Sequence, residues 1–174
     1  EVRFRIENDA VRGVLSQRET FESPVVVNAA GAWADFDDGL PFRIPVKPSR
    51  GQILVFQGEK GLLRHMLHIP GTYAVSRSDG KIFVGSTVES AGFDRSVTVK
   101  GLNKLVSGFL AINPEFSSLR FLEARVGFRP RSKDNQPILG KTPVKGLILA
   151  TGHFRNGVLL ASVTAKRVAG MILG

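Results

Sequence analysis

The chain has 174 residues, 43% hydrophobic and 22% charged, which is typical of a folded globular protein, and no apolar run approaches the roughly 20 residues that cross a bilayer. The net charge is +9, but the basic residues are scattered and only one tryptophan and one tyrosine could stack on bases, so the pattern disfavours nucleic-acid binding and suits a protein that handles anions. The absence of cysteine excludes disulfides, cysteine metal sites, a cysteine nucleophile and a cofactor attached through a thioether.

The amino-terminal part predicts a hairpin followed by a buried strand. Residues 2–6 and 11–15 alternate apolar and polar side chains around a turn-like Asn8-Asp9, which predicts a hairpin with one solvent-facing side. Residues 24–33 (PVVVNAAGAW) are apolar without alternation and end in small residues. Such a run is typical of a parallel strand buried on both faces, whose carboxyl end faces a ligand crevice.

The middle of the chain predicts an antiparallel sheet with a covering helix. Prolines in residues 41–48 indicate an irregular crossing, and residues 52–56 resume as a strand. Residues 73–77 and 81–85 flank Ser-Asp-Gly, a hairpin signature with a glycine where positive φ is needed. Apolar residues at helical spacing predict an amphipathic helix over 99–112, and 121–128 return as a strand.

The carboxyl-terminal part predicts a turn at 143–146, a second buried strand at 147–150 and a last helix. Between strand and helix lies a polar junction, Thr-Gly-His-Phe-Arg-Asn-Gly (151–157), which is longer than a simple turn requires. This length indicates a bound ligand; the alternative is an ordinary turn, and in both cases Asn156 caps the helix. The inner face of the helix is expected to carry Val158, Leu159, Val163, Val168 and Ile172.

This order of elements predicts a mixed α+β and α/β fold in which one domain is inserted into another. The expected domains are residues 1–44, residues 45–125 with the antiparallel sheet and its helix, and residues 126–174, which return to the first domain.

Four stretches of the chain, in this order, resemble the glycine oxidase and D-amino-acid oxidase superfamily of FAD-dependent amine oxidoreductases, most closely its glycine oxidase-like branch. They are VVVNAAGAW, RGQILVF, YAVSRSDGKIFVGSTVESAGFD and GFRPRSKDNQPILG…GLILATGHFRNGVLLASVTA. The resemblance implies that 45–125 bind the substrate and that 1–44 and 126–174 belong to the FAD-binding domain. The implied reaction oxidises the C–N bond of a small amino acid or secondary amine by hydride transfer to the flavin.

The superfamily opens with a Gly-x-Gly-x-x-Gly turn that holds the FAD pyrophosphate on a helix amino terminus, and this sequence has no such turn. We therefore expect the chain to be the carboxyl-terminal half of such an enzyme, weak in FAD binding alone, with a missing FAD-binding half or a partner subunit as its partner. A cytoplasmic location and a non-covalent FAD are expected, and no metal. Substrate, electron acceptor and homo-oligomer formation are left open.

The resemblance places the head of the last helix beside the flavin ring. A helix amino terminus carries partial positive charge and unpaired N–H groups, which stabilise the anionic reduced ring. The cofactor residues implied in the first domain are Ala30, Gly31 and Trp33, and those implied at the junction are Gly152, His153, Arg155, Asn156, Gly157 and Val158. Gly152 and Gly157 are expected to allow close approach of the ring.

Three residues are implied in substrate binding. Arg129 offers a planar two-donor fork for a carboxylate, and the following Pro130 fixes an extended backbone at the arginine. Tyr73 is implied to hold the same carboxylate, the alternative being a tyrosine that only packs on the sheet. Arg155 either adds positive charge near the substrate or forms a surface ion pair. Arg129 and Tyr73 are the expected catalytic residues. The alternative function is a non-enzymatic module that uses the same fold to bind a partner or an anion.

Overall fold

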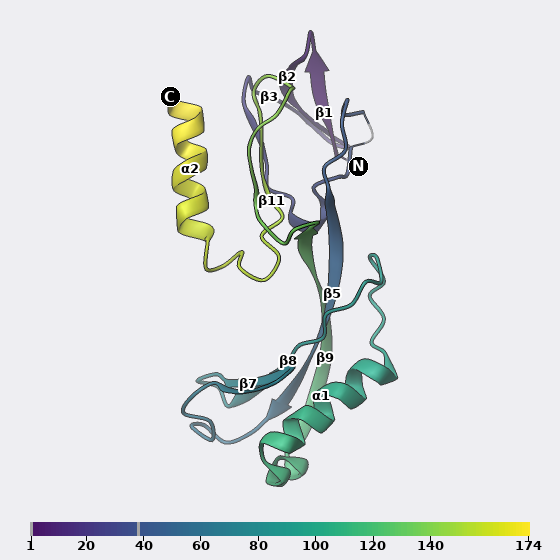
Figure 1. The fold of residues 1–174 in the computed structure, drawn as a ribbon, viewed down its shortest axis with the longest axis vertical. Coiled ribbons are helices and arrows are strands. Elements are labelled where there is room, and N and C mark those ends of the chain that lie inside the picture. Colours follow the sequence, from purple (N-terminus) through teal and green to yellow (C-terminus); the bar gives the residue numbers. More distant parts are fainter. Residues whose placement is uncertain (1, 38) are drawn as a thin grey trace. The chain divides into compact units, whose positions relative to one another are not determined.

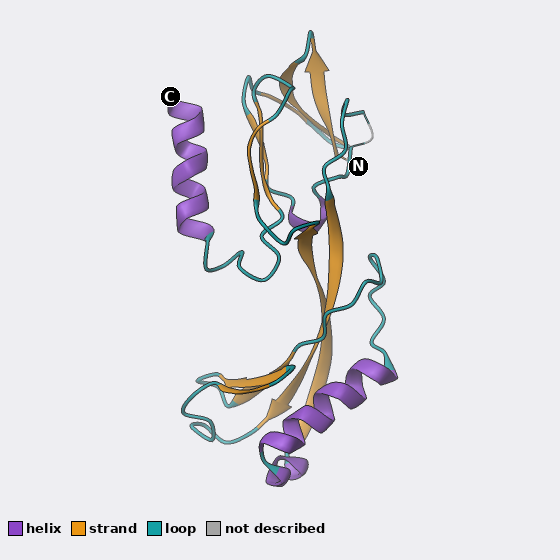
Figure 2. Ribbon diagram, in the orientation of Figure 1, coloured by secondary structure: helices purple, strands orange, loops and turns teal. Residues whose placement is uncertain are grey.

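In the computed structural model, which describes residues 2–37 and 39–174, the chain forms two units. Unit one comprises residues 1–48 together with 129–174, and unit two comprises residues 49–128. Figure 1 gives the elements in chain order and Figure 2 their type. Unit one is therefore built from two segments of the chain, and unit two from one. The assignment of these units to cofactor and substrate stays a prediction.

Unit one begins with the predicted hairpin, which is confirmed. Strand β1 (Val2–Glu7) pairs antiparallel with β2 (Ala10–Ser16). The two turn residues between them have positive φ, 50° at Asn8 and 57° at Asp9, a conformation that these side chains tolerate better than most. A short strand β3 (Thr20–Glu22), which the sequence pattern did not predict, adds to the free edge of β2.

A second sheet of unit one has the strand order β10-β11-β4. Strands β10 (Ile138–Lys141) and β11 (Leu147–Thr151) are antiparallel, whereas β4 (Val26–Asn28) pairs parallel with β11. The predicted buried parallel strand is therefore confirmed. A short 3-10 helix, η1 (Gly31–Trp33), follows β4. The core of unit one consists of Phe4, Val11, Ala34, Leu40, Ile44, Val46, Val144, Leu147 and Leu149.

The last helix, α2 (Ala161–Leu173), lies against β10 and β11 and buries none of its residues fully. It begins later than expected, so Val158 and Leu159 precede it and are 95% and 81% exposed. Their predicted place on its inner face was wrong because backbone turns occupy this stretch: Asn156 N–H donates to His153 O (2.9 Å) and Leu160 N–H to Asn156 O (2.9 Å). The predicted cap was wrong for the same reason, since Leu160 is the N-cap residue and provides no side-chain bond.

Unit two is built on a five-stranded sheet with the order β6-β7-β8-β5-β9. The predicted hairpin is confirmed as β7 (Thr72–Ser76) and β8 (Lys81–Gly85), joined by a turn in which Gly80 has a φ of 84°. Strand β6 (Leu67–Ile69) forms one edge. Strands β5 (Val46–Gln57) and β9 (Arg120–Ser132) are longer than predicted, because the chain stays extended through the prolines near their ends, and the unit boundaries fall within them.

Helix α1 (Val99–Ile112) covers one face of this sheet, as predicted and with the predicted bounds (Figure 1). Thr98 caps it by accepting a hydrogen bond from Gly101 N–H (3.1 Å). The short 3-10 helix η2 (Pro114–Ser118) follows. No helix in the described part of the chain is long and apolar enough to cross a membrane. The core beneath α1 consists of Leu54, Phe56, Leu63, Ala74, Ile82, Val84, Leu105, Phe109 and Phe116.

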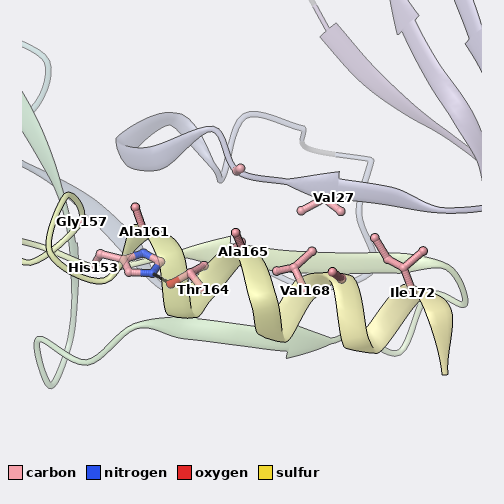
Figure 3. Close-up of a pocket in the computed structure, with 11 residues that line it drawn as sticks. Val27, His153, Gly157, Ala161, Thr164, Ala165, Val168 and Ile172 are labelled. Carbon is pink, nitrogen blue, oxygen red and sulfur yellow. Dashed lines mark hydrogen bonds between the residues drawn. The ribbon is translucent and has the colours of Figure 1, made fainter.

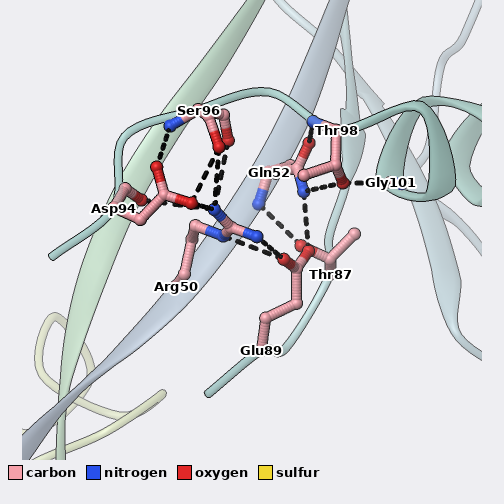
Figure 4. Close-up of polar contacts among 8 residues, drawn as sticks. All are labelled: Arg50, Gln52, Thr87, Glu89, Asp94, Ser96, Thr98 and Gly101. Carbon is pink, nitrogen blue, oxygen red and sulfur yellow. Dashed lines mark hydrogen bonds and ion pairs between the residues drawn. The ribbon is translucent and has the colours of Figure 1, made fainter. Parts of the chain in front are cut away.

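A buried arginine joins β5 to the segment that leads into α1 (Figure 4). Arg50 is 5% exposed; its Nε donates to Glu89 Oε2 (2.8 Å), and its Nη1 pairs with Asp94 Oδ2. Gln52 continues the network, because its Nε2 donates to Glu89 Oε1 (2.7 Å) and its Oε1 accepts from Thr98 N–H (3.0 Å). The charged network therefore fixes the start of α1 relative to the sheet.

These contacts also set the protonation of the two carboxylates. Burial favours the neutral form of Glu89, but hydrogen bonds, led by those from Thr87 and Arg50, outweigh it and hold the pKa of Glu89 below its ordinary value. Hydrogen bonds from Ser96, with a further contribution from Arg50, lower the pKa of Asp94. Both groups are therefore stabilised in their charged form.

Candidate functional site

The polar junction after β11 is folded back against the end of β9 within unit one. Phe154 N–H donates to Pro130 O (2.8 Å), and Arg131 and His153 form an isolated antiparallel bridge. Gly152 and Phe154 have positive φ values of 74° and 50°. The structure thus brings the backbone that follows Arg129 against the junction, two segments that the sequence analysis assigned to one site.

His153 connects this junction to the last helix. It is 9% exposed, and its Nε2 lies 2.9 Å from Thr164 Oγ1 (Figure 3). Because α2 has no fully buried residue, this buried polar contact is an important restraint on where the helix lies.

The turn that leads into α2 offers hydrogen-bond donors. Within the part of the chain that the structure describes, no acceptor pairs with the backbone N–H groups of Gly157, Val158 and Leu159. All three residues are exposed. Unpaired backbone N–H groups are strong donors and can bind electronegative ligand atoms.

The turn after β4 carries the other predicted cofactor residues. Ala30 O accepts from Trp33 N–H (3.1 Å), and Gly31 has a φ of 60°. The Gly31 carbonyl also accepts a hydrogen bond from Thr151 Oγ1 (2.8 Å), next to the junction. Trp33 is 47% exposed. The structure therefore brings the two groups of predicted cofactor residues to one edge of the β10-β11-β4 sheet.

A trough of about 430 Å³ runs between α2 and this sheet (Figure 3). The polar side chains that line it, His153 and Thr164, bond to each other. The other lining residues are apolar or glycine. The volume is within the range of small-molecule sites, but the walls lack charge for a pyrophosphate. The lining residues are Val27, Ala29, Ala150, His153, Gly157, Ala161, Thr164, Ala165, Val168, Ala169 and Ile172.

The two junction glycines have different surroundings. A side chain at Gly152 would come within 3.1 Å of Ile138 N and 3.3 Å of Gln136 O, so this glycine is needed by the chain itself. A side chain at Gly157 would meet only His153 Cβ, at 3.7 Å, an ordinary contact. A role for either glycine in the approach of a ligand stays a prediction.

The predicted substrate residues lie in different units. Arg129 is half-buried on β9 at the start of the second segment of unit one, whereas Tyr73 lies on β7 in unit two. Arg155 places its guanidinium 5.9 Å from the centre of the Phe154 ring. The Tyr73 ring crosses Gly85 of the neighbouring strand: a side chain at Gly85 would meet Tyr73 Oη at 2.6 Å. Their convergence on one substrate stays a prediction.

The sequence analysis left out three polar residues that organise the site: Asn28, Thr151 and Thr164. Asn28 and Thr151 lie at the carboxyl ends of apolar strands, where a buried polar side chain needs a specific partner. A polar residue at the end of an apolar strand could therefore have identified Asn28 and Thr151 from the sequence. Thr164 lies in the last helix, and no sequence pattern distinguishes it.

Comparison with known proteins is consistent with this geometry. Residues 1–171 match the family model described as FAD dependent oxidoreductase. Glycine oxidase of Pseudomonas aeruginosa is 34% identical over 170 residues, covering 97% of this chain and 47% of that enzyme. Hydrogen cyanide synthase subunit HcnC of Pseudomonas protegens is 38% identical over 147 residues, covering 83% of this chain and 35% of that protein.

A solved structure gives the same result for the fold. The crystal structure of iminodiacetate oxidase from Chelativorans sp. BNC1 matches with a TM-score of 0.90 at 28% identity, over 100% of this chain and 49% of that one. The chain thus spans about half the length of the glycine oxidase and of the iminodiacetate oxidase that it matches. Because the family model matches nearly the whole chain and the fold agrees, the chain belongs to the FAD dependent oxidoreductase family.

Proposed function

We propose that this chain is the carboxyl-terminal half of a glycine oxidase-like enzyme that oxidises the C–N bond of a small amino acid or secondary amine. The observation that carries the proposal is the meeting, within unit one, of three segments: the turn at Gly31, the junction at His153 and the strand that follows Arg129. Relatives that include glycine oxidase and iminodiacetate oxidase support this class of substrate.

The residues present fit the edge of a flavin ring. When bound, FAD supplies the hydride acceptor for amine oxidation. The unpaired N–H groups of Gly157, Val158 and Leu159, in the turn before α2, can donate to an electronegative edge and stabilise negative charge on it. The turn at Ala30 and Gly31 would contact the cofactor through its backbone. A side chain at Gly31 would have no neighbour within 4 Å, so space is left at this position.

Arg129 is proposed to bind the substrate carboxylate. Its guanidinium has the two-donor fork that pairs with a carboxylate, and the hydrogen bond between Pro130 and Phe154 fixes the backbone just after it. Tyr73 would donate its hydroxyl to the same carboxylate, and Arg155 would add positive charge nearby. These residues orient the substrate, and orientation alone accounts for a large part of many enzymatic accelerations.

The partner is proposed to be a dinucleotide-binding half, supplied by the same polypeptide or by another subunit. Three observations support it: the chain spans about half of its relatives, the outer edge of β4 pairs with no described strand, and the trough under α2 is apolar. An apolar trough beside an open strand edge suits packed protein better than a pyrophosphate. HcnC is named as a subunit, which supports a partner chain as one source.

The test is to produce the chain together with a Gly-x-Gly-x-x-Gly dinucleotide-binding half and to measure bound flavin by absorbance. Anaerobic bleaching of the flavin by glycine, sarcosine, iminodiacetate or D-amino acids would then identify the substrate. Oxygen consumption and peroxide release would distinguish an oxidase from a dehydrogenase. Failure of the assembled protein to retain flavin would refute the proposal.

A matched pair of variants separates this function from a non-enzymatic binding module. Arg129→Ala should reduce kcat/KM by about 10²-fold or more, since it loses charged hydrogen bonds of several kcal/mol. Arg12→Ala, which removes an exposed arginine from β2, is the control and should leave kcat/KM unchanged. Equal activity of the two variants would favour the non-enzymatic module.

A further inference from the structure

The turn that follows β4 is held more firmly than its own backbone requires. Within it, Trp33 N–H donates to Ala30 O (3.1 Å) and Ala34 N–H donates to Gly31 O (3.2 Å). These two bonds already close a short 3-10 helix. Two buried side chains from outside the helix make further hydrogen bonds to the same few residues, and they come from two different strands.

The first of these side chains is Asn28, the last residue of β4, which is 3% exposed. Its Nδ2 donates to Ala34 O (2.8 Å), and its Oδ1 accepts from Ala30 N–H (3.2 Å). One amide group thus bridges the beginning and the end of the turn. A substitution that changes either atom of the amide would leave one end of the turn unbound.

The second is Thr151, the last residue of β11, which is 1% exposed. Its Oγ1 donates to Gly31 O (2.8 Å), across a separation of 120 residues in sequence. The residues that follow it, Gly152 and His153, begin the junction. The hydroxyl therefore connects the turn to the junction directly.

Packing alone does not explain a polar residue at Thr151. Valine has nearly the same shape and would fill this buried position without a hydroxyl that needs a partner. Strands β4 and β11 are parallel neighbours, so Asn28 and Thr151 end at the same edge of the sheet. Both side chains direct their hydrogen bonds to the turn at that edge.

We propose that Asn28 and Thr151 are positioning residues that hold the turn 30–34 and the junction 152–157 in one fixed arrangement. The inference rests on the proposed function, in which both segments contact the flavin. If the two segments are already held together before the cofactor binds, binding costs no free energy for ordering them. Such preorganisation increases affinity.

The test uses the flavin-bound protein assembled with its dinucleotide-binding half. Thr151→Val should weaken FAD binding by about tenfold, a typical effect of losing one buried hydrogen bond, and should alter the visible circular dichroism of the bound flavin. Thr151→Ser, which keeps the hydroxyl, should restore most of the affinity. Thr142→Val is the matched control, because the bonds that the Thr142 hydroxyl makes to described residues stay within the turn at 142–144, before the other end of β11.

The possible results are distinguishable. If the parent protein binds no FAD, the proposed function fails. If the parent binds FAD but Thr151→Val binds it equally well with an unchanged spectrum, the positioning role is wrong. Equal weakening by Thr151→Val and Thr142→Val would show general destabilisation and would also overturn it. If Thr151→Val does not fold, the same titration with Asn28→Ser, expected to weaken binding to a similar degree, decides the question.

Discussion

The imidazole of His153 and the hydroxyl of Thr164 are joined by a 2.9 Å contact that links the beginning of the strand-to-helix junction to the first turn of α2. Both atoms come from the wall of the apolar trough, where water would compete poorly for them. This side-chain pair therefore helps to position the start of α2 and the turn before it, which carries the unpaired N–H groups.

Thr164→Val should loosen α2. The substitution keeps the shape of the side chain but removes the partner of His153, so the expected loss is about 1–2 kcal/mol of local stability. Amide hydrogen exchange across α2 measures it, and the protection of residues 161–173 should fall. Ser162→Ala, at an exposed position of the same helix, is the control. Unchanged exchange in Thr164→Val would show that the contact does not hold the helix.

Gly85→Ala should displace the ring of Tyr73. The added carbon would lie 2.6 Å from Tyr73 Oη and 3.0 Å from Ile53 Cγ2, too close for either neighbour to stay in place. A loss of about 1–3 kcal/mol in the free energy of unfolding is expected from such overpacking. Denaturant unfolding measures it, and Gly127→Ala, on β9 of the same sheet with nothing within 4 Å, is the control.

A double mutant shows whether this loss acts through the tyrosine. In a Tyr73→Ala background, Gly85→Ala should be better tolerated, with a coupling free energy above about 0.5 kcal/mol. Additive losses would mean that the glycine is required for another reason. The same variants in the assembled enzyme would test Tyr73 as a substrate residue, since a displaced phenol should raise KM.

Arg50→Met should destabilise unit two by about 3 kcal/mol, because it leaves Glu89 without the arginine that neutralises it. The matched control is Arg125→Met, which breaks the exposed ion pair with Glu123 and should change stability by less than about 1 kcal/mol. Hydrogen exchange of α1 and β5 reports on this unit separately. Similar effects of both variants would argue that burial adds nothing to the Arg50 network.

Unit two should lose stability in acid. The pKa values of Glu89 and Asp94 lie below their ordinary values of 4.5 and 3.8 in the folded state. A depressed carboxyl pKa gives stability that is complete above the ordinary value and is lost as the pH falls through the lower, folded value. The denaturant concentration at the unfolding midpoint should therefore decrease once the pH is below about 4. In Arg50→Gln this decrease with falling pH should be smaller. In Arg18→Gln, which changes an exposed arginine, it should equal that of the parent protein.

Local patterns were sufficient for much of the fold. Helix α1 was predicted with its observed bounds because its apolar residues recur at helical spacing and a proline follows shortly after. The turn-like Asn8-Asp9 was expected to join the first hairpin, and both residues have positive φ. The parallel strand β4 was predicted from an apolar run without alternation.

Other features follow from backbone turns or from partners that are distant in sequence. The apolar Val158 and Leu159 resemble part of a helix face, but backbone turns place them before α2. The partners of Arg50 lie 39 and 44 residues away, so no local pattern predicts that pairing. At the site, the resemblance pointed to glycines and charged residues, whereas the contacts that fix the segments come from Asn28 and Thr151.

The division of unit one into two segments has a consequence for synthesis on the ribosome. Residues 49–128 of unit two emerge as one continuous stretch, but β4 meets its parallel neighbour β11 only after about 120 further residues have been translated. At about 5–20 residues per second, this interval lasts roughly 6–24 s. During that time β4 lacks its neighbour in the sheet, so we expect chaperones to protect this apolar strand.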